Sequence, residues 1–283
     1  MEYGKFGLIG HPIAHSLSPA LFKAGYDGRY PYQLIEGSDF EDSYRRFLEG
    51  YEGINVTAPF KELAFVKADI LSPECEAVGA TNLLVKTPDG IKAYNSDYLG
   101  VRMWLSDVAE SLKSVLPPWP QGEGPTTKEW EGFFSSPQPH QTAVKALIVG
   151  LGGAGKAAAA AAESLGMEVI RMNRTIRDER TKPLSDFREC FREADIIIYN
   201  IPTAIPELYE LTDEDFGAGR PKYILEANYR KPSFDEMLLQ KMRTANPMAE
   251  YTSGKIWLLY QAVTGYEIFT GEKPDLRKMS DVL

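Results

Sequence analysis

Lys145-Ala-Leu-Ile-Val-Gly150-Leu-Gly-Gly-Ala-Gly155 is the stretch of this chain that decides its fold. The residues before Gly150 have the apolar pattern of a buried strand, and the helix-like segment Lys156–Leu165 follows the glycines. Gly166 is well placed to end that helix, and Glu168–Met172 reads as the next strand. This order predicts a βαβ unit whose glycine turn lets backbone N–H groups approach a pyrophosphate.

The end of the second strand indicates which dinucleotide is bound. An NAD site usually has an acidic residue there, which holds the ribose 2′-hydroxyl. This chain instead has Asn173-Arg174-Thr175, with Arg177 and Arg180 close behind. Because a guanidinium can bind a 2′-phosphate bidentately, the sequence favours NADP(H) over NAD, with an ordinary basic loop as the alternative. The predicted cofactor-binding residues of this region are Gly150, Gly152, Gly153, Ala154, Gly155, Asn173, Arg174 and Thr175.

A second informative stretch is Ile54-Asn55-Val56-Thr57-Ala58-Pro59-Phe60-Lys61. It reads as a short buried strand that ends where Pro59 can open a helix at its first position. Asn55, Thr57 and Lys61 would then lie at the carboxyl end of a strand, where open α/β sheets bind small ligands. An amide, a hydroxyl and an ammonium suit a polyhydroxylated or anionic small molecule. The alternative is a loop with a solvent-facing lysine.

Short strand-like runs alternate with helical periodicity along the chain, which predicts an α/β fold. Strands are expected at residues 6–9, 32–35, 54–57 and 196–199, a hairpin from 81–86 and 91–94, and helices from residues 19, 39, 59 and 97. Ser18 is expected to cap the first helix, and Ser38 with Glu41 to form a capping box for the second. Residues 114–142 are rich in proline, which predicts an inserted excursion or a linker.

Composition limits the classes of function. The 283 residues suffice for two domains, and the formal net charge of −9 argues against a nucleic-acid partner. The two cysteines form no metal-binding or redox pattern, and three histidines argue against a histidine-rich metal site, so no metal is predicted. No signal peptide or run of membrane-spanning length is visible, so a cytoplasmic setting is expected. The sequence leaves monomer and homodimer open.

These segments stand in an order that resembles the shikimate dehydrogenase family. The resemblance holds from residue 6 to about residue 271, apart from the proline-rich segment. It implies a substrate-binding domain made of residues 1–97 and 253–283, with the C-terminal helices returning to it, and a Rossmann-like NADP-binding domain of residues 98–252. The matching motifs are Gly10-His-Pro-Ile-Ala-His15-Ser16-Leu-Ser18-Pro19, Asn55–Lys61, Gly79-Ala-Thr-Asn82, Asn95-Ser96-Asp97-Tyr-Leu-Gly100, Gly150–Gly155, Asn173–Thr175 and the tail from Gln261 to Gly271.

The resemblance also implies an activity. It is the reversible NADPH-dependent reduction of 3-dehydroshikimate to shikimate, in the pathway to chorismate and the aromatic amino acids. Lys61 and Asp97 would flank the reacting oxygen in a cleft between the domains. A protonated lysine there stabilises the developing alkoxide, and a carboxylate beside it favours the charged form of the lysine and orients it.

The remaining roles follow from the same resemblance. Two hydroxyls would bind the substrate carboxylate with two further residues nearby, two amides would hold ring hydroxyls, and one glycine would border the nicotinamide. The hydroxyls are those of Ser16 and Ser18, and the two residues near them are Thr57 and Tyr229. The amides are those of Asn82 and Gln261, and the glycine is Gly254.

Three segments depart from the family pattern. Asn200-Ile-Pro202-Thr203-Ala-Ile-Pro206 replaces Asn-Ala-Thr-Ser-x-Gly, Trp257 stands where methionine is usual, and Tyr229-Arg230-Lys231-Pro232 has one residue more than Tyr-x-Pro. These departures bear on cofactor pose and substrate preference, so two other functions stay open. One is a quinate/shikimate dehydrogenase that uses NAD, against which Arg174 argues. The other is a non-catalytic ligand sensor that has lost nicotinamide docking.

Overall fold

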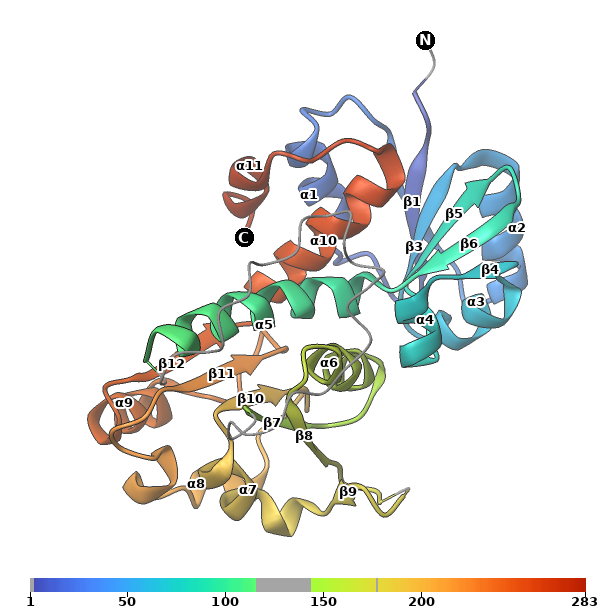
Figure 1. Cartoon of the computed structure of the whole chain (residues 1–283). Helices are drawn as coiled ribbons and strands as arrows, with labels where there is room; N and C mark the ends of the chain where they lie inside the picture. Colours follow the sequence, from blue (N-terminus) through green and yellow to red (C-terminus); the bar gives the residue numbers. More distant parts are fainter. Residues whose placement is uncertain (1–2, 116–143, 177) are drawn as a thin grey trace.

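The computed structural model describes residues 3–115, 144–176 and 178–283. Two six-stranded sheets form separate layers, and the long helix α5 (Ser96–Val115) runs between them (Figure 1). Within the described residues no helix is long and apolar enough to cross a membrane. Arg177 and nearly all of the proline-rich segment predicted at 114–142 lie outside the described residues.

The first sheet has the strand order β2-β1-β3-β5-β6-β4. The strands β1, β2 and β3 are parallel, whereas β5 is antiparallel to β3 and β6, so the predicted hairpin is confirmed. The elements of this part are β1 (Phe6–Gly10), α1 (Ser18–Gly25), β2 (Tyr32–Glu36), α2 (Phe40–Gly50), β3 (Gly53–Val56), α3 (Lys61–Lys67), β4 (Ile70–Leu71), α4 (Pro73–Val78), β5 (Leu83–Thr87) and β6 (Gly90–Tyr94).

Helices cover both faces of this first sheet. On one face, Phe40 and Phe47 of α2 and Ala64 of α3 pack with Ile9 and Ile54 of the strands. On the other face, α1 packs with the two C-terminal helices α10 (Lys255–Thr270) and α11 (Leu276–Ser280). The core of that face contains Phe6, Leu21, Phe22, Leu83, Leu259, Tyr266, Phe269 and Met279. The C-terminal helices therefore return to the first sheet, as the family resemblance implies.

The second sheet is entirely parallel, with the strand order β12-β11-β10-β7-β8-β9. This is the doubly wound Rossmann order, which reverses between β7 and β10 and so creates the usual ligand-binding point. Its elements are β7 (Lys145–Val149), α6 (Gly153–Ser164), β8 (Glu168–Met172), β9 (Thr181–Lys182), η2 (Leu184–Asp186), α7 (Phe187–Glu193), β10 (Ile196–Tyr199), α8 (Pro206–Tyr209), η3 (Asp213–Phe216), β11 (Lys222–Glu226), α9 (Glu236–Ala245) and β12 (Ala249–Ser253).

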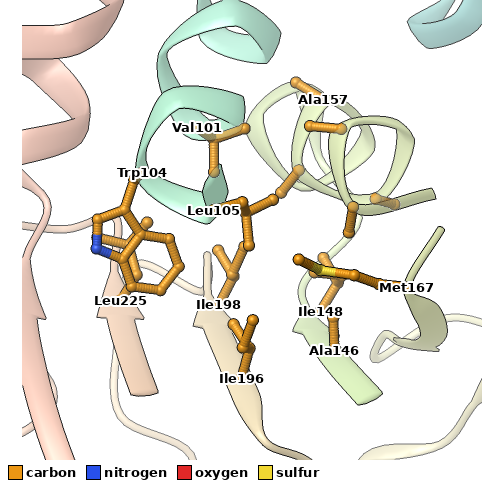
Figure 2. Close-up of a cluster of buried hydrophobic side chains, with 14 of the residues drawn as sticks. Val101, Trp104, Leu105, Ala146, Ile148, Ala157, Met167, Ile196, Ile198 and Leu225 are labelled. Carbon is orange, nitrogen blue, oxygen red and sulfur yellow. The ribbon is translucent and has the colours of Figure 1, made fainter. Parts of the chain in front are cut away.

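The helices α5 and α6 cover one face of the second sheet. Figure 2 shows Val101 and Leu105 of α5 and Ala157 of α6 above Ile148 of β7 and Ile198 of β10. All five side chains are fully buried, so this apolar layer fixes the start of α5 relative to the glycine turn. The opposite face is covered by α7, α8 and α9.

Four local predictions are wrong in detail. Pro59 does not open α3, because the Phe60 N–H donates to the Thr57 carbonyl and closes a turn that holds Pro59. The helix α2 is capped by Asp39, whose carboxylate accepts from the Asp42 N–H, so Ser38 and Glu41 form no capping box.

The starts of two further helices also differ. Ser18 is the first residue of α1 and makes no cap, because its hydroxyl accepts a hydrogen bond from Ser16 instead. The helix α6 begins at Gly153 rather than Lys156, because the last residues of the glycine motif form its first turn. Glycine at that point takes part in the helix, although it is a poor helix former.

Candidate active site

A pocket of about 350 Å³ opens between the two sheets, with walls from both parts of the chain. All eight residues predicted to act on the substrate line it, and so do two of the predicted cofactor-binding residues. These lining residues are Ser16, Ser18, Thr57, Lys61, Asn82, Asp97, Tyr229, Gln261, Ala154 and Gly254. The other predicted cofactor-binding residues lie outside the pocket lining, in the glycine turn and the loop after β8.

Lys61 and Asp97 form an ion pair inside the pocket, although 36 residues separate them. Lys61 is the first residue of α3, and Asp97 lies in the first turn of α5. The distance from Lys61 Nζ to Asp97 Oδ2 is 2.5 Å, and the side chains are 26% and 18% exposed. Asp97 lies at the amino end of α5, where the helix dipole favours a negative group, and both side chains are reachable from the pocket.

Trp257 fixes the backbone next to this ion pair. Its indole Nε1–H donates to the Asp97 carbonyl oxygen at 2.9 Å, and the ring is 5% exposed. From the sequence, tryptophan here is expected to alter the shape of the site, but nothing in the sequence indicates this hydrogen bond between α10 and α5. A residue 160 positions away in the chain thus holds the backbone of Asp97.

A buried network holds the two predicted amides. The side-chain Oδ1 of Asn82 accepts from the Ser96 N–H at 2.7 Å, and Ser96 Oγ donates to Gln261 Oε1 at 3.1 Å. A Cβ on Gly100 would lie 2.5 Å from the Gln261 backbone nitrogen, so only glycine allows α5 and α10 to approach this closely. Ser96 is not among the predicted site residues, although its position between Asn95 and Asp97 in the matching motif is an available signal.

The hydroxyl pair lies in the loop between β1 and α1. Ser16 Oγ donates to Ser18 Oγ at 3.1 Å and also accepts from the Ser18 N–H at 3.2 Å. The Tyr266 hydroxyl donates to the Ser18 carbonyl oxygen, and full burial raises the pKa of Tyr266 well above its ordinary value. Tyr266 therefore stays a neutral donor that fixes this loop. Asn55 also lines the pocket, but its side chain accepts from the Tyr32 hydroxyl at 2.8 Å.

The glycine turn has the shape that a pyrophosphate needs. Gly150 has a φ of 89°, and a Cβ on Gly155 would lie 1.8 Å from the Gly150 carbonyl oxygen, so both positions require glycine. Asn173 lies beside the turn and accepts from the Leu151 N–H. A Cβ on Gly153 would lie 3.9 Å from Lys61 Cδ, so the positive end of α6 is next to the ion pair.

Arg174 is exposed and makes no hydrogen bond or ion pair with any other described residue. Its neighbours Asn173 and Thr175 are joined by a hydrogen bond from the Asn173 amide to the Thr175 carbonyl oxygen at 3.1 Å. The Arg174 guanidinium lies at the strand end and pairs with no other described side chain, so it suits a 2′-phosphate. The glycine turn suits the pyrophosphate. The residues present therefore fit NADP(H).

Comparison with known proteins gives a consistent result for both parts of the chain. Residues 8–84 match the family model described as shikimate dehydrogenase substrate binding domain, and residues 126–225 match the NAD binding domain of D-isomer specific 2-hydroxyacid dehydrogenase. A shikimate dehydrogenase (NADP(+)) of Methylobacterium radiotolerans is 30% identical over 288 residues, which cover 94% of this chain and 91% of the relative.

Solved structures share the fold. The shikimate 5-dehydrogenase of Thermus thermophilus in complex with shikimate has a TM-score of 0.68 at 25% identity, covering 98% of this chain and 96% of that one. The quinate dehydrogenase of Corynebacterium glutamicum in complex with NAD has a TM-score of 0.70, covering 99% and 98%. At 20% identity the second likeness concerns the fold alone.

The doubly wound sheet, the glycine turn and the polar pocket beside it define a dinucleotide-dependent oxidoreductase with a separate substrate-binding part. The near-complete match at 30% identity then settles its relationship. The chain belongs to the shikimate dehydrogenase family.

Proposed function

We propose that this chain is an NADP-dependent shikimate dehydrogenase, which interconverts 3-dehydroshikimate and shikimate. The observation that carries the proposal is the 2.5 Å contact of Lys61 and Asp97 in a pocket that the glycine turn of α6 also borders. The curated relatives are NADP(+) enzymes, and Arg174, which pairs with no described residue, agrees with that cofactor. Residues 1–97 with 253–283 form the substrate-binding domain in this proposal, and residues 98–252 form the NADP-binding domain.

Bound NADPH supplies the hydride, and the chain supplies the charges around the reacting oxygen. Lys61 lies where its ammonium can donate a hydrogen bond to the ketone oxygen, which gains negative charge as the carbon is reduced. The ammonium stabilises this charge and has a proton to give as the alcohol forms. Asp97 accepts a hydrogen bond from the same ammonium and so fixes its direction, while Trp257 fixes the backbone of Asp97.

The remaining pocket residues bind and orient the ring. Ser16 and Ser18 offer hydroxyl donors for the carboxylate, with Thr57 and Tyr229 also lining the pocket. Because Ser96 Oγ donates to Gln261 Oε1, the Nε2 amide hydrogens of Gln261 are the donors that would bind the ring hydroxyls, and Asn82 also lines the pocket. Amide N–H donors suit the oxygens of ring hydroxyls.

The proposed function is tested by following reduced-cofactor formation with shikimate or quinate and with NADP⁺ or NAD⁺. We expect shikimate with NADP⁺ to give the highest kcat/KM of the four combinations. Shikimate binding in a calorimeter without turnover in any combination would contradict the proposal and identify a ligand sensor instead.

Replacing Arg174 with glutamine is expected to raise the KM for NADP⁺ by about 10- to 100-fold, because a charge-assisted bidentate contact to the 2′-phosphate is lost. The KM for NAD⁺, which has no such phosphate, should change by less than about threefold on the same reasoning. Steady-state kinetics with both cofactors give the two values. Arg46→Gln removes another exposed charge, from α2, and serves as the control. Equal effects on NADP⁺ and NAD⁺ would contradict the assignment.

A further inference from the structure

Arg230 lies in the segment that carries one residue more than the family pattern. It follows β11 in the part of the chain that holds the glycine turn, and it lines the same pocket as Lys61. Its Nη2 donates to the His15 carbonyl oxygen at 2.7 Å, across 215 residues of sequence. His15 directly precedes Ser16, so the guanidinium lies at the loop that carries the hydroxyl pair Ser16 and Ser18.

The charges of the pocket make this arginine distinctive. Among the described residues that line the pocket, the lysine and arginine side chains are Lys61 and Arg230, and the one carboxylate is Asp97. Lys61 and Asp97 neutralise each other at 2.5 Å. Arg230 contacts a neutral carbonyl and, within the described chain, no carboxylate. The described lining thus has one uncompensated positive charge, in a chain whose net charge is −9.

The geometry of the guanidinium leaves donors for a ligand. Arginine has five N–H donors in a planar fork, and the contact with His15 uses one nitrogen. The guanidinium carbon lies 5.7 Å from the centre of the Tyr229 ring, a contact that limits the directions of the side chain. A guanidinium held in this way binds a carboxylate more strongly than hydroxyl donors do, because its hydrogen bonds are assisted by its positive charge.

We infer that Arg230 is a carboxylate-binding residue of the substrate site and sets a preference for acids over their neutral derivatives. The inference rests on the proposed function. Ser16 and Ser18 provide neutral donors from the substrate-binding side of the pocket, and Arg230 provides the positive charge from the opposite side. Recognition of the carboxylate therefore also joins the two walls of the pocket.

Kinetics of Arg230→Gln with shikimate and with its methyl ester test the inference. We expect the KM for shikimate to rise by about 10- to 100-fold, because a charged hydrogen bond is lost, with kcat changed by less than about threefold. The KM for the ester should stay within about threefold of that of the unaltered chain, because the ester has no charge to lose. The KM for NADP⁺ should be unaffected.

Lys231→Gln is the matched control, since it removes the same charge one position along the loop from an exposed side chain that does not line the pocket. We expect its KM values to equal those of the unaltered chain. An unchanged shikimate KM in R230Q, an equal rise for the ester, or equal effects of R230Q and K231Q would each overturn the inference. Turnover of shikimate by the unaltered chain is measured first, and its absence would contradict the proposed function rather than the role of Arg230.

Discussion

Replacing Lys61 with alanine is expected to lower kcat for shikimate oxidation by about 10²- to 10⁴-fold, with little change in KM. The reason is that the ammonium interacts with the reacting oxygen most strongly when that oxygen carries negative charge, so its loss affects the transition state more than the bound substrate. Asp97 would also lose its 2.5 Å partner and remain as an uncompensated charge in the pocket. Steady-state kinetics with shikimate and NADP⁺ measure both constants.

Lys67→Ala provides a matched control for this variant. Lys67 is the last residue of the same helix, α3, and its ammonium pairs with Glu41 on the surface, where both side chains are largely exposed. This change should leave kcat within about twofold, because surface ion pairs contribute little. A kcat for K61A equal to that of K67A would show that the lysine does not act on the reacting oxygen. A rise confined to KM would show that it only binds the substrate.

Replacing Asp215 with asparagine is expected to lower the free energy of unfolding by about 3 kcal/mol. The Asp215 side chain is fully buried, and its two oxygens accept from Arg188, Arg192 and the Thr212 N–H. Removing the carboxylate leaves the charges of Arg188 and Arg192 uncompensated. The expected loss of about 3 kcal/mol is at the lower end of the usual range, because both arginines retain access to solvent. Denaturant unfolding measures the loss.

Asp213→Asn is the control for Asp215, since Asp213 lies in the same short helix η3 and is exposed. Its effect should be below about 0.5 kcal/mol, as is usual for surface positions. A loss for D215N no larger than that for D213N would show that the buried charge cluster does not stabilise the fold.

Acid should weaken the same cluster. Burial alone raises the pKa of the Asp215 carboxyl, but hydrogen bonds from the Thr212 backbone N–H and from Arg192 and Arg188 outweigh it and lower the pKa from 3.8 to about 2. Since the pKa is lower in the folded than in the unfolded state, this stabilisation is complete above about pH 4 and is lost as the pH falls towards about 2. The difference in unfolding free energy between the unaltered chain and D215N should therefore shrink over that interval. A constant difference would contradict the assignment.

The sequence predicts the parts of this molecule that depend on local signals. The glycines from Gly150 to Gly155, with a strand before and a helix after them, predict the Rossmann-like part. The signal is local, because the tight turn between strand and helix itself requires glycine. The cap of α2 is harder to place, because Ser38 and Asp39 are both good caps and only the hydrogen bond to the Asp42 N–H distinguishes them.

The parts that could not be predicted depend on contacts between distant segments. Trp257 donates to the Asp97 carbonyl oxygen, 160 residues away in the chain, and Arg230 donates to the His15 carbonyl oxygen, 215 residues away. No helical or strand periodicity in the sequence indicates contacts at such separations. The arginine partners of Asp215 likewise come from α7, 23 and 27 residues earlier in the chain. The family resemblance is what predicts the pairing of Lys61 with Asp97, since 36 residues separate them and four strands or helices lie between α3 and α5.

A crystal structure with NADP⁺ and shikimate bound tests the central claim most directly. The account predicts that Lys61 Nζ and Asp97 lie within hydrogen-bond distance of one hydroxyl oxygen on the shikimate ring, and that the carbon bearing this hydroxyl faces the nicotinamide, with the pyrophosphate at the amino end of α6. Shikimate bound with a different edge towards Lys61, or a dinucleotide that does not contact the glycine turn, would contradict it.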